Sequence, residues 1–397
     1  MAASGAAGSR CAGARRSRPN VRPRWRRPHV DAHRTVRPPA AVALARMHRC
    51  PVRRSPMRTF VLAALLLPGP ALAASVDVVM SGLDNPRGLA FAADGSLYVA
   101  EAGHGGTSPC ISIRGTAFCH GPSGAISRLR HGRQERIISG LPSIADPAAT
   151  EAAGPNGISF HGMIGYVTMG FAGVAPSVRA EFGAAGRVFG HLLRFTPGGT
   201  WRVVADVSAH EARQNPAGGP VETNPFGVLS EAAAHYVTDA AGNALLRVAP
   251  SGGITTVATF PSRPAAGTDA VPTGVVRGPD GALYVGQLTG VPFADGAASV
   301  FRIAPGGYPT VWASGFKTII DLEFAADGSL YVLQHASGPV FFAGRGQLLR
   351  VAPDGSRSLV LGNLDRPTSL AIGPDRALYV ANRGITPMGG EVLRVVP

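Results

Sequence analysis

The sequence predicts an all-β fold, a six-bladed β-propeller whose blades are four-stranded antiparallel sheets. The main observation is a repeated phrase: six of the seven tyrosines are followed by valine and then by a small or apolar residue. These tyrosines are Tyr98, Tyr166, Tyr236, Tyr284, Tyr331 and Tyr379. Neighbouring members stand 47 to 70 residues apart. A repeat of about 40 to 50 residues built from short strands is typical of β-propellers.

Each repeat contains four short strands, and the fifth repeat shows this most clearly. Its apolar or alternating runs lie at 322–324, 330–332, 348–351 and 358–361. Turn-forming residues separate the runs, as expected for an antiparallel meander. Asp-Gly pairs, which favour hairpin turns with positive φ, recur at 94–95, 280–281, 327–328 and 354–355.

The third strand of each repeat carries an arginine in the same register. The six are Arg128, Arg194, Arg247, Arg302, Arg350 and Arg394. A charge repeated in every blade is more typical of a brace or a solvent-facing group than of an anion site, and we interpret these arginines in that way. The repeated tyrosines are interpreted as packing between blades.

The last repeat, residues 366–397, contains only three predicted strands. The other end of the propeller can supply the fourth, because Val76–Leu83 resembles the fourth strand at Ile137–Leu141. We therefore expect the N-terminal strand to complete the last blade. The ring then closes and leaves no exposed sheet edge.

The charge of the chain is divided unevenly. The whole sequence has a formal net charge of +14, but residues 1–74 hold 15 of the 38 basic residues and one acidic residue. Residues 75–397 carry 23 basic and 23 acidic residues. A neutral propeller offers no broad attraction for a phosphate backbone, so no nucleic-acid partner is expected.

The N-terminal head has two parts. Residues 1–56 are rich in Arg, Ala and Pro without apolar periodicity, so they are expected to be disordered. Residues 57–74 have a basic start, a short apolar run and an Ala-x-Ala end. This pattern predicts a secretory signal peptide, too short to span as an ordinary membrane helix.

A signal peptide normally begins a chain, so Met47 or Met57 is expected to be the true start instead of Met1. A genuine disordered extension is the alternative. The mature protein is then expected to be the propeller of residues 75–397, monomeric, secreted or periplasmic, and without a transmembrane segment.

Two cysteines remain after the expected cleavage, Cys110 and Cys119. A closely spaced pair in an exported chain predicts a disulfide that closes a loop. Two free thiols are the alternative. His104 and His120 lie nearby, but their spacing matches no zinc pattern.

Candidate binding residues gather on the face that carries the long connections 102–124, 171–190 and 206–224, since long loops on rigid scaffolds often bind ligands. Three positions after each repeated tyrosine, the residue type varies. Residues that enter the innermost strands lie beside these positions. The candidate ligand-binding residues are Glu101, His104, Asn156, Asn224, Asp239, Gln287, Asp321, Gln334, His335 and Asn382.

The oxygen atoms in this set are suited to a hard cation such as Ca²⁺ or to a small polar ligand. The carboxylates of Glu101, Asp239 and Asp321 are the candidate metal ligands. The alternative is structural, because any propeller lines its channel with polar groups that bond water and loop backbone.

The assembled phrases resemble the ScyD/ScyE family of exported propellers, which are related to NHL-repeat proteins. The resemblance covers nearly all of 76–397. Its carrying segments are SGLDNPRGLAFAADGSLYVAEAG at 81–103, CHGPSGAISRL at 119–129, NPAGG with ETNPFGV at 215–228, and YVTDAAGNALLRVAPSG at 236–252. The resemblance implies the fold and export. It implies little about chemistry, because the molecular activity of the family is poorly defined.

Calcium-dependent lactonases of the gluconolactonase type have similar blades, and the comparison implies where a metal would lie. The equivalent positions at the entrances of the innermost strands are Arg87, Asn156, Phe226, Thr273, Ile320 and Thr368. Only Asn156 among them could bind a metal, and none is a carboxylate. A lactonase needs its metal to polarise the ester and activate water, so that site is expected to be absent.

Two functional hypotheses follow. The first is a non-catalytic exported propeller that binds a protein, glycan or small molecule on its loop-rich face. The second is a metal-dependent, lactonase-like hydrolase or an oxidoreductase, with its site at the mouth of the central channel. The second would draw on Glu101, His104, Asp239, Asp321 and His335.

Overall fold

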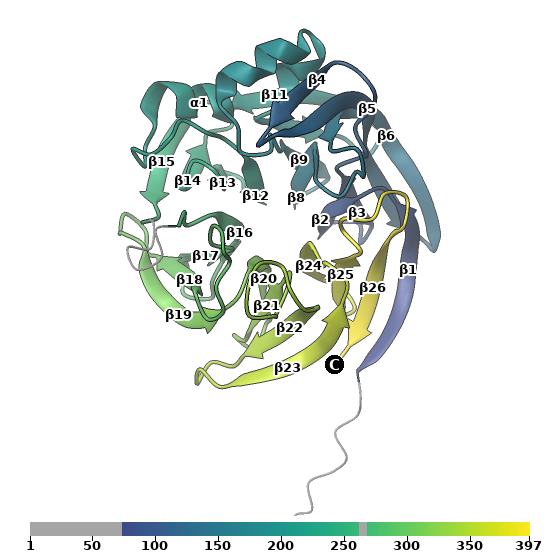
Figure 1. Ribbon diagram of the computed structural model, residues 1–397. Helices are drawn as coiled ribbons and strands as arrows, with labels where there is room; N and C mark the ends of the chain where they lie inside the picture. The colour runs from purple at the N-terminus through teal and green to yellow at the C-terminus, as the bar shows by residue number, and fades with distance from the viewer. Residues whose placement is uncertain (1–73, 262–267) are drawn as a thin grey trace, which may run out of the picture. The chain divides into compact units, whose positions relative to one another are not determined.

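The computed structural model describes residues 74–261 and 268–397. In this part of the chain, six antiparallel sheets form blades around a central opening (Figure 1). The predicted all-β, six-bladed propeller is thereby confirmed. The predicted disordered segment at 1–56 and signal peptide at 57–74 lie outside the described residues, apart from Ala74. No helix in the described residues is long and apolar enough to cross a membrane.

One strand from each blade faces the central opening in Figure 1. These innermost strands are β2 (Pro86–Phe91), β8 (Pro155–His161), β12 (Pro225–Ser230), β16 (Pro272–Arg277), β20 (Ile319–Phe324) and β24 (Ser369–Ile372). Four of them begin with proline. Proline has no N–H to donate to the ladder, and the first residue of a strand is one of the few positions where this loss is tolerated.

The second and third strands complete the middle of each blade. The second strands are β3 (Leu97–Glu101), β9 (Ile164–Met169), β13 (His235–Asp239), β17 (Leu283–Gln287), β21 (Leu330–Gln334) and β25 (Leu378–Asn382). The third strands are β5 (Thr116–Arg130), β10 (His191–Phe195), β14 (Ala244–Val248), β18 (Ala298–Ile303), β22 (Gly346–Val351) and β26 (Gly390–Val396).

The outer strands and the inserted elements complete the propeller. The outer strands are β6 (Arg133–Ala145), β11 (Trp201–Asp206), β15 (Ile254–Thr259), β19 (Thr310–Phe316), β23 (Arg357–Leu364) and β1 (Ser75–Leu83). The inserted elements are β4 (Cys110–Ile113), β7 (Ala152–Ala153), the 3₁₀ helices η1 (Pro176–Phe182) and η2 (Ala185–Val188), and α1 (Val207–Gln214).

The ring closes as the sequence predicted. Strand β1 pairs antiparallel with β26, with Val76 opposite Val395, and so becomes the outer strand of the sheet that β24 and β25 begin. The first strand of the propeller therefore completes its last blade, which is the last to be synthesised.

The repeated tyrosine and the repeated arginine are direct cross-strand partners in all six blades. In blade four, Arg302 Nε donates a hydrogen bond of 2.6 Å to Asp280 Oδ2, which also accepts one of 3.2 Å from the Tyr284 hydroxyl. Asp280 belongs to an Asp-Gly turn of the same blade. Arg302 thus braces the blade through a cross-strand pair and a turn.

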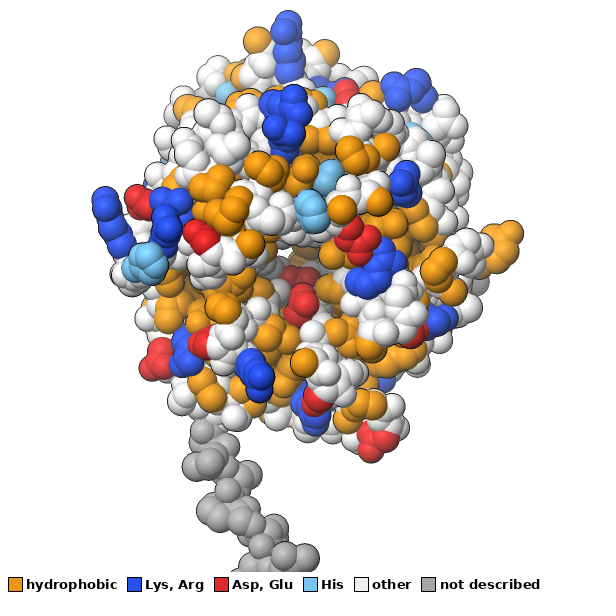
Figure 2. All heavy atoms as spheres, turned by 180° about the vertical axis from the view of Figure 1, so that it is seen from behind, with side chains coloured by type: hydrophobic (Ala, Val, Ile, Leu, Met, Phe, Trp, Pro, Cys, Tyr) orange, Lys and Arg blue, Asp and Glu red, His pale blue; other side chains and the backbone are white. Residues whose placement is uncertain are grey.

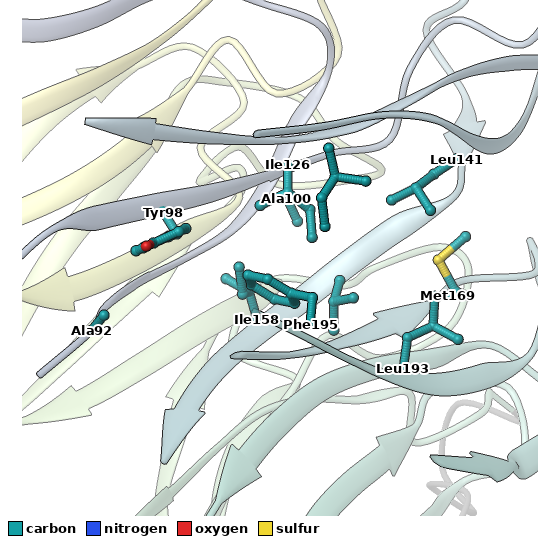
Figure 3. Packing of buried hydrophobic residues seen from close by; sticks show 11 residues of the cluster. Ala92, Tyr98, Ala100, Ile126, Leu141, Ile158, Met169, Leu193 and Phe195 are labelled. Carbon is teal, nitrogen blue, oxygen red and sulfur yellow. The ribbon is translucent and has the colours of Figure 1, made fainter. Parts of the chain in front are cut away.

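The core of the propeller lies between neighbouring blades. Tyr98 is fully buried, and its ring lies 4.6 Å from that of Phe160 in the next blade. Figure 3 shows this packing between blades one and two, with Tyr98, Ala100, Ile126 and Leu141 from the first blade and Ile158, Met169, Leu193 and Phe195 from the second. Tyr98 therefore packs between blades, as predicted.

Candidate functional site

Two of the three long connections pack together over the first two blades. A separate apolar cluster joins the β4–β5 hairpin to η1 and to the residues around η2. Its buried members are Ile111, Ile113, Phe118, Ile144, Ala153, Phe171, Phe182 and Phe189. The third connection joins them through a bridge between Val174 and Thr223. These loops are therefore ordered by a core of their own.

Cys110 and Cys119 form the predicted disulfide within this assembly. The two residues face each other across the β4–β5 hairpin, with their Cα atoms 4.0 Å apart. The bond closes the hairpin beside the apolar cluster, so it supports the loop-rich face of blade one.

The variable residues after the repeated tyrosines lie at the ends of the second strands, where they are buried. Four of them accept a hydrogen bond from a backbone N–H just ahead of the innermost strand of the same blade. The pairs are Glu101 with Asp84, Asp239 with Asn224, Gln334 with Lys317, and Asn382 with Asp365. These four side chains hold the entry to each innermost strand.

Glu101 shows how complete this bonding is. Its carboxylate accepts from the Asp84 N–H at 2.7 Å, from Ser127 Oγ at 2.5 Å, and from Arg136 at 3.1 and 2.6 Å. The side chain of Glu101 is 0% exposed, whereas that of Arg136 is 39% exposed. Both oxygen atoms of the Glu101 carboxylate are therefore already hydrogen-bonded within the protein.

Asp239 has a buried carboxylate neighbour that the sequence reading did not select. Asp239 accepts from Thr223, Asn224 and Gly242, and burial raises its pKa. A Cβ added to Gly242 would lie 3.0 Å from Glu211 Oε2 and 3.2 Å from Asp239 Oδ2. Glu211, in α1, is 2% exposed and has an Oε1 with no partner in the described chain. Burial first, and the charge of Asp239 second, raise the pKa of Glu211 to about 7.

The two predicted histidines are separated in the fold. His104 is half-exposed, and its Nδ1 lies 2.5 Å from Asp84 Oδ2. His335 is buried, with Nδ1 bonded to the Pro367 carbonyl at 2.9 Å and its ring edge-on to Phe342. Burial lowers the pKa of His335 to about 4, so it is neutral at pH 7.

Asn156 and Asn224 are brought together by the structure. A Cβ added to Gly170 would lie 3.1 Å from Asn224 Oδ1 and 3.4 Å from Asn156 Nδ2. Asn224 Oδ1 accepts from the Phe171 N–H at 2.9 Å. Both amides are partly exposed, at the entrances of β8 and β12.

Gln287 does not bond the entry to the innermost strand of its blade, because Asn243 of the preceding blade accepts those hydrogen bonds instead. Asn243 Oδ1 accepts from the N–H groups of both Ala270 and Val271, each at 3.0 Å. Gln287 is 1% exposed, and its amide oxygen and nitrogen both lack a partner in the part of the chain described. Lys317, in the next blade, is also 1% exposed, and its ammonium has no hydrogen-bond partner among the described residues.

Three of the six lactonase-like positions, Arg87, Thr273 and Thr368, donate to backbone carbonyls. Arg87 donates to the carbonyls of Gly384 and Ala152, each at 2.8 Å, and so crosses the channel mouth between two loops. The Thr273 and Thr368 hydroxyls bond carbonyls of neighbouring innermost strands. Across residues 74–261 and 268–397, no group of three or more His, Cys, Asp or Glu residues is placed to hold a metal ion.

The innermost strands approach most closely one residue below this mouth. Gly88, Gly157, Gly227, Gly274, Asp321 and Ser369 occupy equivalent positions. A Cβ at Gly88 would lie 2.6 Å from the Asn156 carbonyl oxygen, and one at Gly274 would lie 2.5 Å from Asp321 Oδ1. The four glycines are needed because a side chain at any of them would collide with the next blade, whereas blades five and six have Asp321 and Ser369 at this level.

The channel holds a cavity of about 360 Å³ lined by residues of all six innermost strands. Its acidic members are Asp321 and Glu323, both on β20. Figure 2, which views the face opposite to that in Figure 1, shows a hollow at the centre with acidic side chains in it. Glu323 lies two residues further along β20 than Asp321, and is therefore about 7 Å further from the loop-rich mouth of the channel.

Asp321 is bonded by the protein. Its Oδ2 accepts from Ser369 Oγ at 2.6 Å and from the Leu370 N–H at 3.0 Å, and its Oδ1 accepts from the Leu322 N–H at 2.9 Å. Burial raises its pKa to about 6, against these hydrogen bonds. Asp321 is a predicted site residue that the structure places in the cavity.

Glu323 is the cavity residue that the sequence reading missed. No hydrogen bond joins its carboxyl group to the described residues, and it is only partly exposed. Burial first, and the charge of Asp321 second, raise its pKa to about 8. The signal was its place two residues after Asp321, since alternate residues of a strand share a face.

A larger cavity, of about 710 Å³, opens beside η1, η2 and the β10–β11 edge. Arg179 forms a two-bond pair with Asp206 at 3.0 and 3.1 Å, and His191 Nε2 lies 3.4 Å from the same carboxylate. Arg179 and Asp206 therefore neutralise one another, and Arg187, which also lines this cavity, is exposed.

Comparison with known proteins identifies the fold. No family model and no curated protein matches the chain. A solved protein of unknown function from Bacteroides thetaiotaomicron aligns with 82% of this chain and 76% of its own, at a TM-score of 0.53 and 9% identity. A Thermus protein described as a putative oxidoreductase (glucose dehydrogenase) aligns with 82% of this chain and 100% of its own, at a TM-score of 0.51 and 20% identity.

A streptogramin B lyase also aligns with 81% of this chain and 97% of its own, at a TM-score of 0.46 and 14% identity. That similarity is too low to carry an argument about activity. The neighbours include enzymes, but at these identities they show the fold alone. The chain is therefore a β-propeller whose fold is similar to those of the Bacteroides and Thermus proteins.

Proposed function

We propose that the protein is a ligand-binding propeller that takes a small molecule into its central channel. The observation that carries this proposal is the cavity of about 360 Å³ with Glu323 in its wall, whose carboxyl group has no hydrogen-bond partner among the residues that the structure describes. Small-molecule sites typically have volumes of about 300 to 1,000 Å³, apolar walls and a few convergent polar groups. Carboxyl groups with raised pKa in a cavity are typical of functional sites.

Of the ligand classes expected from the sequence, a small molecule fits this geometry best. Many predicted residues of the loop-rich face are buried and bonded to backbone, which leaves fewer free groups for a protein or glycan partner. The lactonase-like alternative has less support, because Arg87 stands where a metal ligand would be needed. A guanidinium repels a metal ion.

We also propose that the protein acts outside the cytoplasm and belongs with the ScyD/ScyE propellers. The disulfide supports export, because such bonds persist in oxidising compartments. The segments at 81–103 and 215–228 support the family. N-terminal sequencing of the released protein checks the export proposal: a mature end near Ser75 is expected, and an intact head contradicts it.

A fragment-binding screen on a filled channel tests the main proposal. Ala90 lines the cavity, so Ala90→Phe should fill it and abolish the binding of small-molecule fragments seen by ligand-observed NMR. Ala93→Phe, at an exposed turn of the same blade, is the matched control and should leave binding unchanged. Fragments that bind both variants equally, or a screen without hits, would contradict the channel as the site.

A further inference from the structure

The charges around the channel cavity are unbalanced. Its titratable lining residues are Asp321, Glu323 and Arg277. Arg277 is already paired, because its Nε and Nη2 donate to the two oxygens of Glu231 at 2.8 and 2.6 Å. Asp321 and Glu323 therefore face the cavity without a cationic partner in the described chain.

The remaining wall offers little hydrogen bonding. Its side chains are mainly apolar, and they include Leu89, Phe91, Ile158, Phe160, Leu229 and Ile372. The two serines of the wall are engaged: Ser369 donates to Asp321, and Ser159 Oγ accepts from the Ser230 N–H at 3.0 Å. A hydroxyl-rich sugar would lose its bonds to water here and regain few.

We propose that the channel ligand is an organic cation, an ammonium group on an apolar body, whose charge pairs with Glu323. This inference rests on the proposed function and names the ligand class. An anion would meet two carboxyl groups, whereas a cation supplies the missing counter-charge. The apolar body would contact the apolar wall, where burial of its surface favours binding.

Binding of a cation should expel a proton from the site. Burial and the Asp321 charge raise the pKa of Glu323 to about 8, so Glu323 holds its proton at pH 7. The other charged groups facing it are Asp321 on its own strand and the paired Arg277 on β16. Strands β2, β8, β12 and β24 add no titratable lining residue. When the ammonium arrives, the carboxyl O–H bond breaks, the proton passes to buffer, and the carboxylate pairs with the cation.

Titration calorimetry with three probes of the same apolar body tests this inference. The probes are 4-phenylbutylamine as its ammonium ion, 4-phenylbutan-1-ol and 4-phenylbutyrate, each titrated at pH 7.0 in phosphate and in Tris. The ammonium should bind about tenfold or more tightly than the alcohol, as one charge-assisted hydrogen bond implies. The apparent enthalpies in the two buffers should differ by about one proton released per ammonium bound.

Two variants separate the charge from the fold. Glu323→Gln keeps the shape of the side chain and should abolish both the preference for the ammonium and the proton release. Glu181→Gln removes an exposed carboxylate outside the cavity and should change neither. Circular dichroism verifies that both variants are folded.

The outcomes distinguish this inference from the proposed function. Equal binding of ammonium and alcohol, or tighter binding of the butyrate, overturns the cation and leaves a channel site standing. If none of the probes binds, the cation inference falls, and the fragment screen with Ala90→Phe then decides whether the channel binds any ligand. Unchanged ammonium binding in Glu323→Gln excludes Glu323 as the partner.

Discussion

Ser369 Oγ donates a hydrogen bond of 2.6 Å to Asp321 Oδ2, and this contact joins the innermost strands of blades five and six. The same oxygen accepts the Leu370 N–H at 3.0 Å. A carboxylate in the channel wall thus connects two blades at the level where four other blades have glycine. Asp321 therefore contributes both to the cavity and to the ring that surrounds it.

The bond between Asp321 and Ser369 should be measurable as a coupling. Asp321→Ala removes the acceptor of the Leu370 N–H and of the Ser369 hydroxyl proton, although Ser369 Oγ still accepts from the Leu89 N–H, and it should lower the free energy of unfolding by about 1–3 kcal/mol. Ser369→Ala should cost about 1 kcal/mol, because Leu370 still bonds the carboxylate. Urea denaturation of both single variants and the double variant gives the coupling energy. A coupling near zero would show that the two side chains do not interact.

The stability of the protein should fall as the pH rises from 7 to 8 because of Glu323. The folded state holds the Glu323 proton up to a pKa of about 8, whereas the unfolded state loses it near the ordinary glutamate pKa of 4.5. The folded state therefore binds more protons in this window, and stability decreases with pH by up to about 1.4 kcal/mol per unit. The buried histidines titrate lower, so they contribute little there.

Denaturation of wild type and Glu323→Gln at several pH values between 7 and 8.5 checks this. The wild-type slope should be the more negative one, and the variant should keep only the smaller slope that Glu211, with its pKa raised to about 7, contributes near pH 7. Parallel slopes would show that Glu323 is already ionised in the folded protein.

Replacement of Lys317 should stabilise the protein. It is the only lysine in the sequence and is 1% exposed, with no partner for its ammonium among the residues described. Burial is the first cause that lowers its pKa. Lys317→Met keeps the length of the chain and removes the unpaired charge, so the free energy of unfolding should rise by about 1–3 kcal/mol.

The control for this variant is Lys317→Arg, which keeps the charge in a larger group and should lower the stability. Thermal denaturation of the wild type, Lys317→Met and Lys317→Arg ranks the three proteins by stability. Loss of stability in Lys317→Met would show that the ammonium has a partner, such as bound water or an ion.

Glu101 should be among the most sensitive positions of the propeller. Glu101→Ala removes the acceptor for Asp84, Ser127 and Arg136 and should cost about 3–5 kcal/mol, the usual cost of breaking a buried pair. Arg136→Ala should also destabilise the protein, because it leaves the fully buried Glu101 carboxylate without its cation, although Asp84 and Ser127 still bond it. A Glu101→Ala variant as stable as the wild type in chemical denaturation would contradict the structural role of Glu101.

The disulfide should support the loop-rich face. Removal of both cysteines, Cys110→Ser with Cys119→Ser, opens a loop with a sequence separation of 9 residues. Chain-entropy arguments for loops of this size predict a loss of about 2–3 kcal/mol. Denaturation with and without reductant checks this, since reductant should weaken the wild type and leave the variant unchanged.

The sequence by itself determined the architecture. Tyr98 and its five equivalents set the repeat, and Val76–Leu83 predicted the closing strand, because strand alternation and turn chemistry are local and recur in each blade. The disulfide of Cys110 and Cys119 was also predictable from spacing. None of these needed knowledge of how the blades face one another.

Only the tertiary structure decided which polar residues are free. Glu101 and Asp239 were predicted as site residues, but the fold surrounds them with donors from other segments of their own blades. Glu323 was not selected, yet it lies in the cavity with no hydrogen-bond partner among the described residues. The physical reason is that hydrogen-bond satisfaction and burial depend on which segments the fold brings together, within a blade for Glu101 and Asp239 and across all six innermost strands for the cavity around Glu323.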